Sequence, residues 1–265
     1  MKDVKSYKVK SYPVSRRITS ELFHQALKHH VVHGLLEIDV TTIRKIIRQR
    51  RLQGEEISFT GYIVFCLAKA LKENEVFNAM RKGNRKVIIF EDVDVALLIE
   101  VEQNWKNVPL LFIIRAADKK SFQEINEEIQ RAKEAKRNAA TKQDKLLAFY
   151  FLLPKCIRKW LINFRYKHNP FFRKKMGGTA AVSSVGMFAA GGGWGIPISL
   201  QTTFLLVGGV ESKPVVRENK IVIREMVNVT FSFDHDLIDG AIASRLTARV
   251  KTLIESAFGL EKYLE

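Results

Sequence analysis

The C-terminal third of the chain carries the clearest pattern of hydrophobic and polar positions. Apolar and polar side chains alternate from residue 227 to residue 234, and this period of two predicts a half-buried β-strand. After Asp239 and Gly240 the apolar residues follow helical spacing, at Ile242, Leu246, Val250, Leu253 and Ile254. The stretch FSFDHDLIDGAIASRL, residues 231–246, is therefore predicted to run from a strand through a tight connection into a helix. His235 comes where that strand ends.

The same two periods predict the elements before this stretch. Residues 34–40 alternate as a strand, and the next segment reads as a helix with Thr41 or Thr42 as its cap. A core-facing helix is predicted over 58–80 and a mostly solvated helix over 120–145. Further strands are predicted in KVIIFEDVDVALLIEVE (two), VPLLFIIRAAD, GGTAAVSSVGMF and SLQTTFLLVGGV, with GGGWGIP as a loop. This order favours an α/β protein with a mixed β-sheet flanked by helices, in a single domain over residues 1–265.

Composition narrows the class of protein. The 265 residues are 46% hydrophobic, enough to bury a substantial core. The two cysteines lie far apart in apolar stretches, which argues against a disulfide framework or a zinc knuckle. The N-terminus lacks the apolar core of a secretory signal, and no apolar run approaches the roughly 20 residues that span a bilayer. We therefore expect a cytoplasmic protein.

The formal net charge of +16 favours an anionic partner, and much of it comes from residues 154–175. This segment has eight Lys or Arg, no acidic residue and five aromatic residues. The first interpretation is an amphipathic helix that packs on its own domain with its basic face in solvent. Contact with an anionic membrane surface ranks second, and nucleic acid ranks third.

His235 admits two interpretations from its position alone. A histidine at the mouth of a core strand is well placed to act as a general base, because its ordinary pKa lies near neutrality. A single histidine near a strand end is also commonly a solvated or hydrogen-bonded bystander. Spacing does not choose between them.

A resemblance over roughly residues 10–260 adds to this pattern. DHDLIDGAIASRL resembles the His-x-x-x-Asp-Gly signature of the acyltransferase component of 2-oxo acid dehydrogenase complexes, which chloramphenicol acetyltransferase shares. GGTAAVSSVGMF is similar to that family's glycine-led strand. LEIDVTTIRKI, SFTGYIVFCLAKALKENEVFNA and the blocks around VDVALLIE and VPLLFIIRAADKKSFQEI resemble its other segments in the expected order.

The resemblance implies a chloramphenicol acetyltransferase-like fold and a role for each motif residue. His235 would be the base that takes a proton from the acceptor, and Ser183 the donor to the oxyanion, with Ser184 as the fallback. Asp239, followed by Gly240, would pair with Arg17 or Arg16 to hold the loop, although an Asp before a helix is also a common cap. The resemblance further implies a homotrimer, in which the histidine of one subunit faces the serine of its neighbour.

The leading hypothesis is thus an acyltransferase that moves an acyl group from a thioester to a thiol, hydroxyl or amine. Its acyl carrier would be coenzyme A or lipoamide, with no metal. The chain starts close to the first matching block, so we expect no lipoyl domain and no subunit-binding domain in it. A separate lipoyl protein or a soluble acyl-coenzyme A would then supply the acyl group. The rival hypothesis is a non-catalytic trimeric scaffold or membrane-associated binding protein with the same fold.

Three other features receive structural interpretations. Trp194, in the glycine-rich loop, could lie near the substrate, but a surface loop is favoured. His29 and His33 have helical i, i+4 spacing that would suit zinc, yet no acidic or cysteine ligand accompanies them, so we expect a surface patch. Cys66 lies on the predicted core helix and is interpreted as a packing residue.

Overall fold

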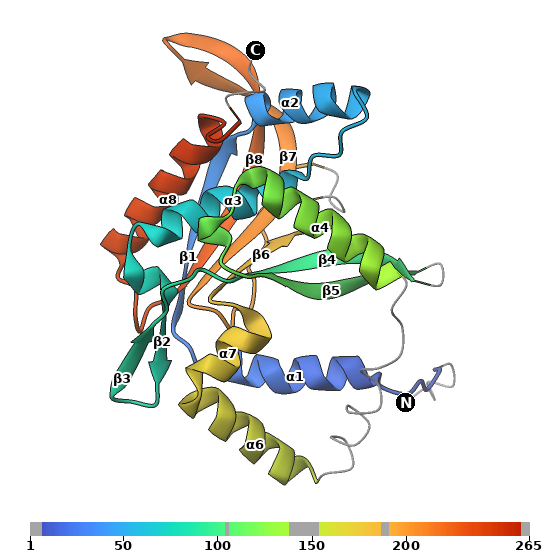
Figure 1. Ribbon diagram of the computed structural model, residues 1–265, viewed down its shortest axis with the longest axis vertical. Coiled ribbons are helices and arrows are strands. Elements are labelled where there is room, and N and C mark those ends of the chain that lie inside the picture. Colours follow the sequence, from blue (N-terminus) through green and yellow to red (C-terminus); the bar gives the residue numbers. More distant parts are fainter. Residues whose placement is uncertain (1–6, 104–105, 138–153, 187–190, 261–265) are drawn as a thin grey trace, which may run out of the picture.

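A six-stranded mixed sheet forms the centre of the fold (Figure 1). The computed structural model describes residues 7–103, 106–137, 154–186 and 191–260. The strand order is β1-β8-β7-β6-β4-β5, and β6 runs parallel to both of its neighbours while the other pairs are antiparallel. The bounds are β1 Val31–Asp39, β4 Val95–Gln103, β5 Lys106–Ile114, β6 Ala180–Ser184, β7 Thr203–Arg217 and β8 Lys220–Asp234. Strands β2 (Ala79–Lys82) and β3 (Lys86–Ile89) form a separate hairpin.

Helices cover the sheet and close one end of the molecule. α3 (Phe59–Lys72) packs against α4 (Phe122–Arg137) and α8 (Gly240–Glu255), and Figure 1 shows these three helices in front of the strands. α2 (Thr41–Leu52) packs against α3 and α8 as well. Three helices lie at the end of the molecule opposite to α2, at the bottom of Figure 1: α1 (Val14–Ala26), α6 (Lys155–His168) and α7 (Pro170–Gly177). The predicted mixed sheet flanked by helices is confirmed.

Helix α3 is the centre of the hydrophobic core, but it is shorter than predicted. Ser58 accepts a hydrogen bond from the Gly61 amide at 3.1 Å and so caps its first turn, and Cys66 is among its fully buried residues. The prediction of a helix to residue 80 is wrong, because α3 ends at Lys72. The side chain of Asn74 accepts a hydrogen bond from the Val76 amide, which starts a short 3-10 helix, η1 (Glu75–Asn78), instead of another α-turn.

The start of α2 also differs from the prediction in its cap. Thr41 and Thr42 are the first residues inside the helix, and Val40 occupies the cap position. Asp39 supplies the acceptor, because its Oδ1 receives hydrogen bonds from both the amide and the hydroxyl of Thr41 at 3.0 and 2.6 Å. The carboxylate satisfies a helix-terminal amide that the threonine hydroxyl was expected to satisfy.

From residue 226 to its end, strand β8 is buried on both faces, so the prediction of a half-buried strand over residues 227–234 is wrong. The alternating polar residues Asn228, Thr230 and Ser232 are as buried as their apolar neighbours. The glycine-rich loop from residue 191 covers this second face: a Cβ added at Gly208 or Gly209 of β7 would lie 2.3 or 2.1 Å from loop carbonyl oxygens. Glycine at these positions lets the loop backbone lie directly on the strand.

Residues 154–175 form two helices rather than one, with the break at Asn169 and Pro170. Asn169 accepts a hydrogen bond from the Phe172 amide and starts α7. α6 packs on α1, where Arg158 forms an ion pair with Glu21 at 3.1 Å with both side chains largely buried. Trp160 and Phe164 stack on each other yet remain 61% and 55% exposed. In the part of the chain that the structure describes, no helix is long and apolar enough to span a bilayer. Whether the segment contacts a membrane or nucleic acid stays a prediction.

Candidate functional site

His235 lies immediately after β8, in the turn that leads to α8, as the strand period predicted. Its side chain is exposed, and its backbone amide donates to the carbonyl of His30 at 2.7 Å. The backbone bond fixes the turn against the residue that precedes β1. An imidazole on a fixed turn with an open side is available to a substrate.

The buried carboxylate of Asp234, at the end of β8, forms hydrogen bonds that stabilise the same turn. Its Oδ2 lies 2.7 Å from Nδ1 of His29, and its Oδ1 accepts the amide of Asp236 at 3.1 Å. Burial works to raise the pKa of Asp234, but the hydrogen bond and the charge of His29 outweigh it, and the pKa lies below its ordinary value. Asp234 therefore ties Asp236, the residue after His235, to His29 in the turn before β1.

We expect Asp234→Asn to destabilise the protein by roughly 1–3 kcal/mol at neutral pH, because a charged acceptor of a buried hydrogen bond is replaced by a neutral one. Since the folded-state pKa is depressed, the contribution of the carboxylate is present above the unfolded pKa of about 4 and is lost as pH falls through the folded pKa. Denaturant unfolding of wild type and variant between pH 2 and 7 checks this. The two stabilities should converge at low pH; a constant difference over the whole range would contradict the assignment.

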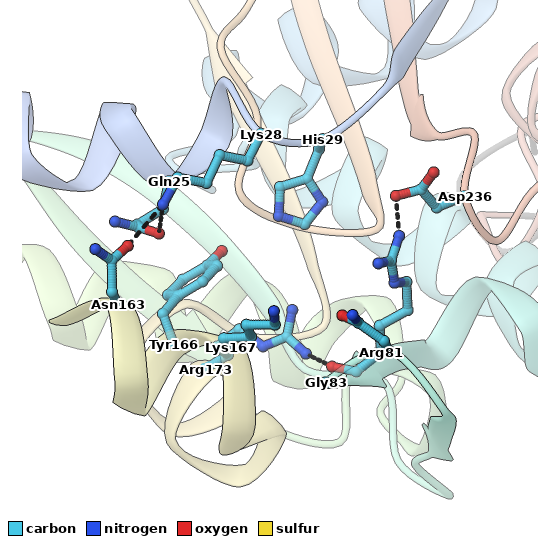
Figure 2. A pocket seen from close by; sticks show the side chains of 11 residues that line it. Gln25, Lys28, His29, Arg81, Gly83, Asn163, Tyr166, Lys167, Arg173 and Asp236 are labelled. Carbon is cyan, nitrogen blue, oxygen red and sulfur yellow. Dashed lines mark hydrogen bonds and ion pairs between the residues drawn. The ribbon is translucent and has the colours of Figure 1, made fainter. Parts of the chain in front are cut away.

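Asp236 ties the turn to two further elements. Its carboxylate pairs with Nδ1 of His30 at 2.9 Å and with the guanidinium of Arg81 on β2. Figure 2 shows the Asp236–Arg81 pair at the edge of a pocket that His29 also lines. The turn that carries His235 is therefore fastened to the start of β1 and to the β2–β3 hairpin.

Ser183 and Ser184 face opposite sides of the sheet. Ala180 and Val182 belong to the hydrophobic core, so Ser184 shares their face, and Ser183 points to the other side. Through Leu206 of β7, the register places Ser183 level with Thr230 of β8. On its face, Gly195 of the glycine-rich loop approaches the side chain of Leu206.

A single chain does not bring Ser183 and His235 together. His235 follows Thr230 by five residues, or about 16 Å along the strand, and Ser183 lies two strands away, about 10 Å across the sheet. A hydroxyl at that distance cannot contact a group that reacts at His235. Any site that uses both residues must draw them from two different subunits.

Asp239 occupies the cap position of α8, where Gly240 is the first helical residue. Its side chain accepts no capping hydrogen bond and is exposed. Within residues 7–103, 106–137, 154–186 and 191–260 it forms no ion pair with Arg16 or Arg17; Nε of Arg17 donates instead to the carbonyl of Tyr12 at 3.1 Å. The proposed pairing of Asp239 with one of these arginines stays a prediction.

Trp194 belongs to the loop that covers β7 and β8, and its indole is partly exposed. Its Nε1 donates to the carbonyl of Leu36 at 3.3 Å, and Nζ of Lys213 lies 6.0 Å from its ring centre. Leu36 pairs with Val229, six residues or about 20 Å along the strand from His235. Within one chain, Trp194 is remote from the histidine.

The histidines near the start of β1 do not have the helical spacing that the sequence suggested. His33 lies in β1 and His29 lies in the turn before it, so the i, i+4 argument is wrong for this pair. Each has a separate partner, since Nδ1 of His33 lies 2.8 Å from the hydroxyl of Ser232. Over the described residues, no group of three or more His, Cys, Asp or Glu could hold a metal ion.

Cys66 behaves as the packing residue that the helical pattern indicated. Burial raises the pKa of its thiol to about 12, with a hydrogen bond to Tyr62 as a smaller opposing effect. The thiol is therefore protonated at neutral pH and has little nucleophilic character.

Most of the chain matches one family of known catalytic domains. The catalytic domain of 2-oxoacid dehydrogenase acyltransferases matches residues 5–149 and 172–260. The lipoamide acyltransferase component of the branched-chain alpha-keto acid dehydrogenase complex of Bacillus subtilis (strain 168) is 27% identical over 230 residues, covering 84% of this chain and 46% of that protein. The dihydrolipoyllysine-residue acetyltransferase component of the pyruvate dehydrogenase complex of Staphylococcus aureus (strain Mu50) is 25% identical over 92% of this chain and 50% of its own length.

Solved structures show the same fold. A probable dihydrolipoamide acetyltransferase from Listeria monocytogenes superposes with a TM-score of 0.71 at 21% identity, covering 95% of each chain. The cubic core of the pyruvate dehydrogenase multienzyme complex superposes with a TM-score of 0.71 at 19% identity, covering 100% of this chain and 98% of that one. The chain spans about half the length of the curated relatives it matches. On the match over residues 5–149 and 172–260, this chain belongs to the family of 2-oxoacid dehydrogenase acyltransferase catalytic domains.

Proposed function

We propose that this protein is an acyltransferase that moves an acyl group between a thioester and a thiol, with His235 as the general base. The observation that carries the proposal is the family match, which includes the turn where His235 stands exposed at the end of β8. The names of the relatives specify lipoamide and dihydrolipoyllysine. Dihydrolipoamide and coenzyme A are accordingly the proposed thiols, and a hydroxyl or amine acceptor is a wider version of the same chemistry.

In the proposed reaction, the imidazole of His235 takes the proton of the acceptor thiol. The thiolate attacks the carbonyl carbon of the thioester, and the carbonyl oxygen becomes an oxyanion. When the tetrahedral intermediate collapses, the bond to the original sulfur breaks and that sulfur receives the proton from the imidazolium. Acyl group and proton have then exchanged places, and His235 is neutral again.

Ser183 is the proposed donor to the oxyanion, supplied by a neighbouring subunit. Its hydroxyl lies on the sheet face opposite the helix-covered core, and it is too far from His235 in its own chain to share an intermediate with it. In a homotrimer with three sites between subunits, Ser183 of one subunit can face a neighbour and lie close to the neighbour's His235. Asp239 and Gly240 would support the histidine turn, the segment between β8 and α8 that carries His235, with Asp239 paired to Arg16 or Arg17. Ser184 remains the alternative donor to the oxyanion. Trp194 is a weaker candidate for contact with the substrate.

The activity is testable with purified protein, acetyl-coenzyme A and dihydrolipoamide. We expect formation of S-acetyldihydrolipoamide with equimolar release of coenzyme A, at a turnover of about 1 per second or faster, as is usual for enzymes. Longer and branched acyl-coenzyme A donors in the same assay identify the preferred acyl chain. Binding of coenzyme A without any transfer would contradict the proposed enzyme and support the non-catalytic trimeric scaffold.

A further inference from the structure

A pocket beside the histidine turn is built partly from residues outside the family match. It has a volume of about 340 Å³ and lies between the α1–β1 junction, the β2–β3 hairpin, α6 and α7 (Figure 2). The match stops at residue 149 and resumes at residue 172, so the wall contributed by α6, with Asn163, Tyr166 and Lys167, belongs to the segment that the family does not share. Asp236 links this pocket to the turn that carries His235.

The lining of the pocket is strongly cationic. Lys28, Arg81, Lys167 and Arg173 face a single carboxylate, Asp236. That carboxylate is already paired with Arg81 and with His30. Among the described residues, Nζ of Lys28 donates to two neutral side-chain amides, Gln25 at 3.2 Å and Asn163 at 2.6 Å, and forms no ion pair. The lining therefore has three more positive than negative side chains, and a cavity of this charge attracts anions.

Arg173 is the most informative member of the lining, because its positive charge is buried. The residue is 9% exposed, its Nη2 donates to the carbonyl of Arg81, and its guanidinium lies 5.2 Å from the ring centre of Tyr166. Its Nε is buried and has no hydrogen-bond partner among the residues that the structure describes. No carboxylate of the described residues forms an ion pair with it.

A buried guanidinium of this kind is costly unless an anionic group pairs with it. Burial lowers the pKa of Arg173, while its interaction and hydrogen bond with Tyr166 and the charge of Asp234 act in the opposite direction, yet an arginine remains charged in any ordinary solution. Buried charges are normally paired, since an unpaired one loses its hydration without recovering an equivalent interaction. Tyr166 does not supply a negative charge to Arg173, because burial raises the pKa of its hydroxyl, which donates to the carbonyl of Leu200 at 2.8 Å.

We propose that this pocket binds the phosphate or carboxylate of a small organic anion, with Arg173 at its inner end and Lys28 and Lys167 nearer the entrance. The planar guanidinium suits either oxyanion, and the two lysines add charge without imposing a geometry. The volume exceeds that of an inorganic ion, so the anionic group belongs to a larger molecule. The proposal concerns equilibrium binding alone and holds whether or not His235 is a base.

Titration calorimetry with inorganic phosphate, glycerol 3-phosphate and succinate, at constant ionic strength, tests the site. We expect millimolar or tighter binding of at least one probe, and the phosphate and carboxylate arms decide which group the pocket prefers. Arg173→Gln is expected to weaken that binding by roughly tenfold to a hundredfold, because it removes a charged hydrogen-bond donor. Lys175→Gln is the matched control: it lies exposed on the same helix, does not line the pocket, and is expected to change the affinity less than twofold.

If Arg173→Gln does not unfold cooperatively and is therefore misfolded, a second variant tests whether the pocket binds the anion. Lys167 is exposed on α6 and lines the pocket, so Lys167→Gln removes a pocket charge without opening the core. A loss of affinity of about threefold or more would support the site, since a charge at the edge of a site contributes less than a buried one. Absence of binding by all three probes to the wild type, or equal losses in Lys167→Gln and Lys175→Gln, would overturn it. Neither result bears on acyl transfer, which is measured separately.

Discussion

His235→Ala is expected to lower kcat for acyl transfer from acetyl-coenzyme A to dihydrolipoamide by about a hundredfold to ten-thousandfold, the range usual for loss of a general base. The effect belongs to kcat because the thiol of the bound acceptor keeps its proton and attacks poorly. The side chain of His235 is exposed, and its structural bond to His30 comes from the backbone amide, which alanine retains. We therefore expect the thermal midpoint and the far-ultraviolet circular dichroism to match those of the wild type.

The division of the loss between kcat and KM separates a base from a residue that only binds the substrate. With His235 as the base, the alanine variant loses kcat while the KM for dihydrolipoamide stays within about threefold of the wild-type value. His24→Ala is the control, since His24 is exposed on α1 and has no role in the proposed reaction. Wild-type rates in His235→Ala, with the transfer assay working, would remove the mechanism.

Mixing two inactive variants is expected to restore activity if the site lies between subunits. Ser183→Ala should lower kcat by roughly a hundredfold to a thousandfold through loss of an oxyanion donor. When Ser183→Ala and His235→Ala chains are co-expressed in equal amounts, each site has about a one-in-four chance of combining an intact histidine from one subunit with an intact serine from its neighbour. The whole co-expressed pool should therefore recover about a quarter of wild-type activity, and trimers that contain both chains about a third, since one of their three sites is intact. The physical reason is the separation of the two residues along and across the sheet of one chain.

Two different affinity tags, one on each variant, make this experiment decisive. Oligomers that retain both tags contain both chains, and only these are assayed. Recovery in the doubly tagged fraction supports a shared site, whereas activity no higher than that of the single variants would contradict it. A Ser184→Ala chain in place of Ser183→Ala tests the alternative donor; loss of activity with Ser184→Ala alone would transfer the role to the residue on the opposite face.

Local periodicity was sufficient to predict the strand and the helix on either side of His235. The alternation up to Phe233 and the helical spacing from Ile242 depend only on which side of a strand or helix each residue occupies, so the strand, turn and helix around His235 could be read from the chain. The same reasoning failed where a neighbouring segment decided the outcome. β8 has a polar face that looks solvent-exposed in isolation, but the glycine-rich loop, more than 30 residues earlier in the chain, covers it.

Around the candidate site, too, local sequence indicated the polar residues but not their partners. Asp234 and Asp236 flank His235, and this spacing was a readable signal of a polar turn, yet their partners His29, His30 and Arg81 lie about 150 to 200 residues away. Arg173 belongs to residues 154–175, whose positive charge is evident from composition alone. Its burial could not be predicted, because a run of basic residues is normally a solvated surface.

The sequence by itself determined the family, the mixed α/β fold and the position of His235 at the end of a strand, because all three depend on short ordered motifs and on residue periodicity. Only the tertiary structure decided which side of the sheet Ser183 faces, how far it lies from His235, and that a buried arginine lines a cationic pocket next to the histidine turn. These depend on strand register and on contacts between segments distant in the chain. Local periodicity indicates the apolar face of a helix or strand, but the burial of a polar or charged side chain depends on which distant segments pack against it.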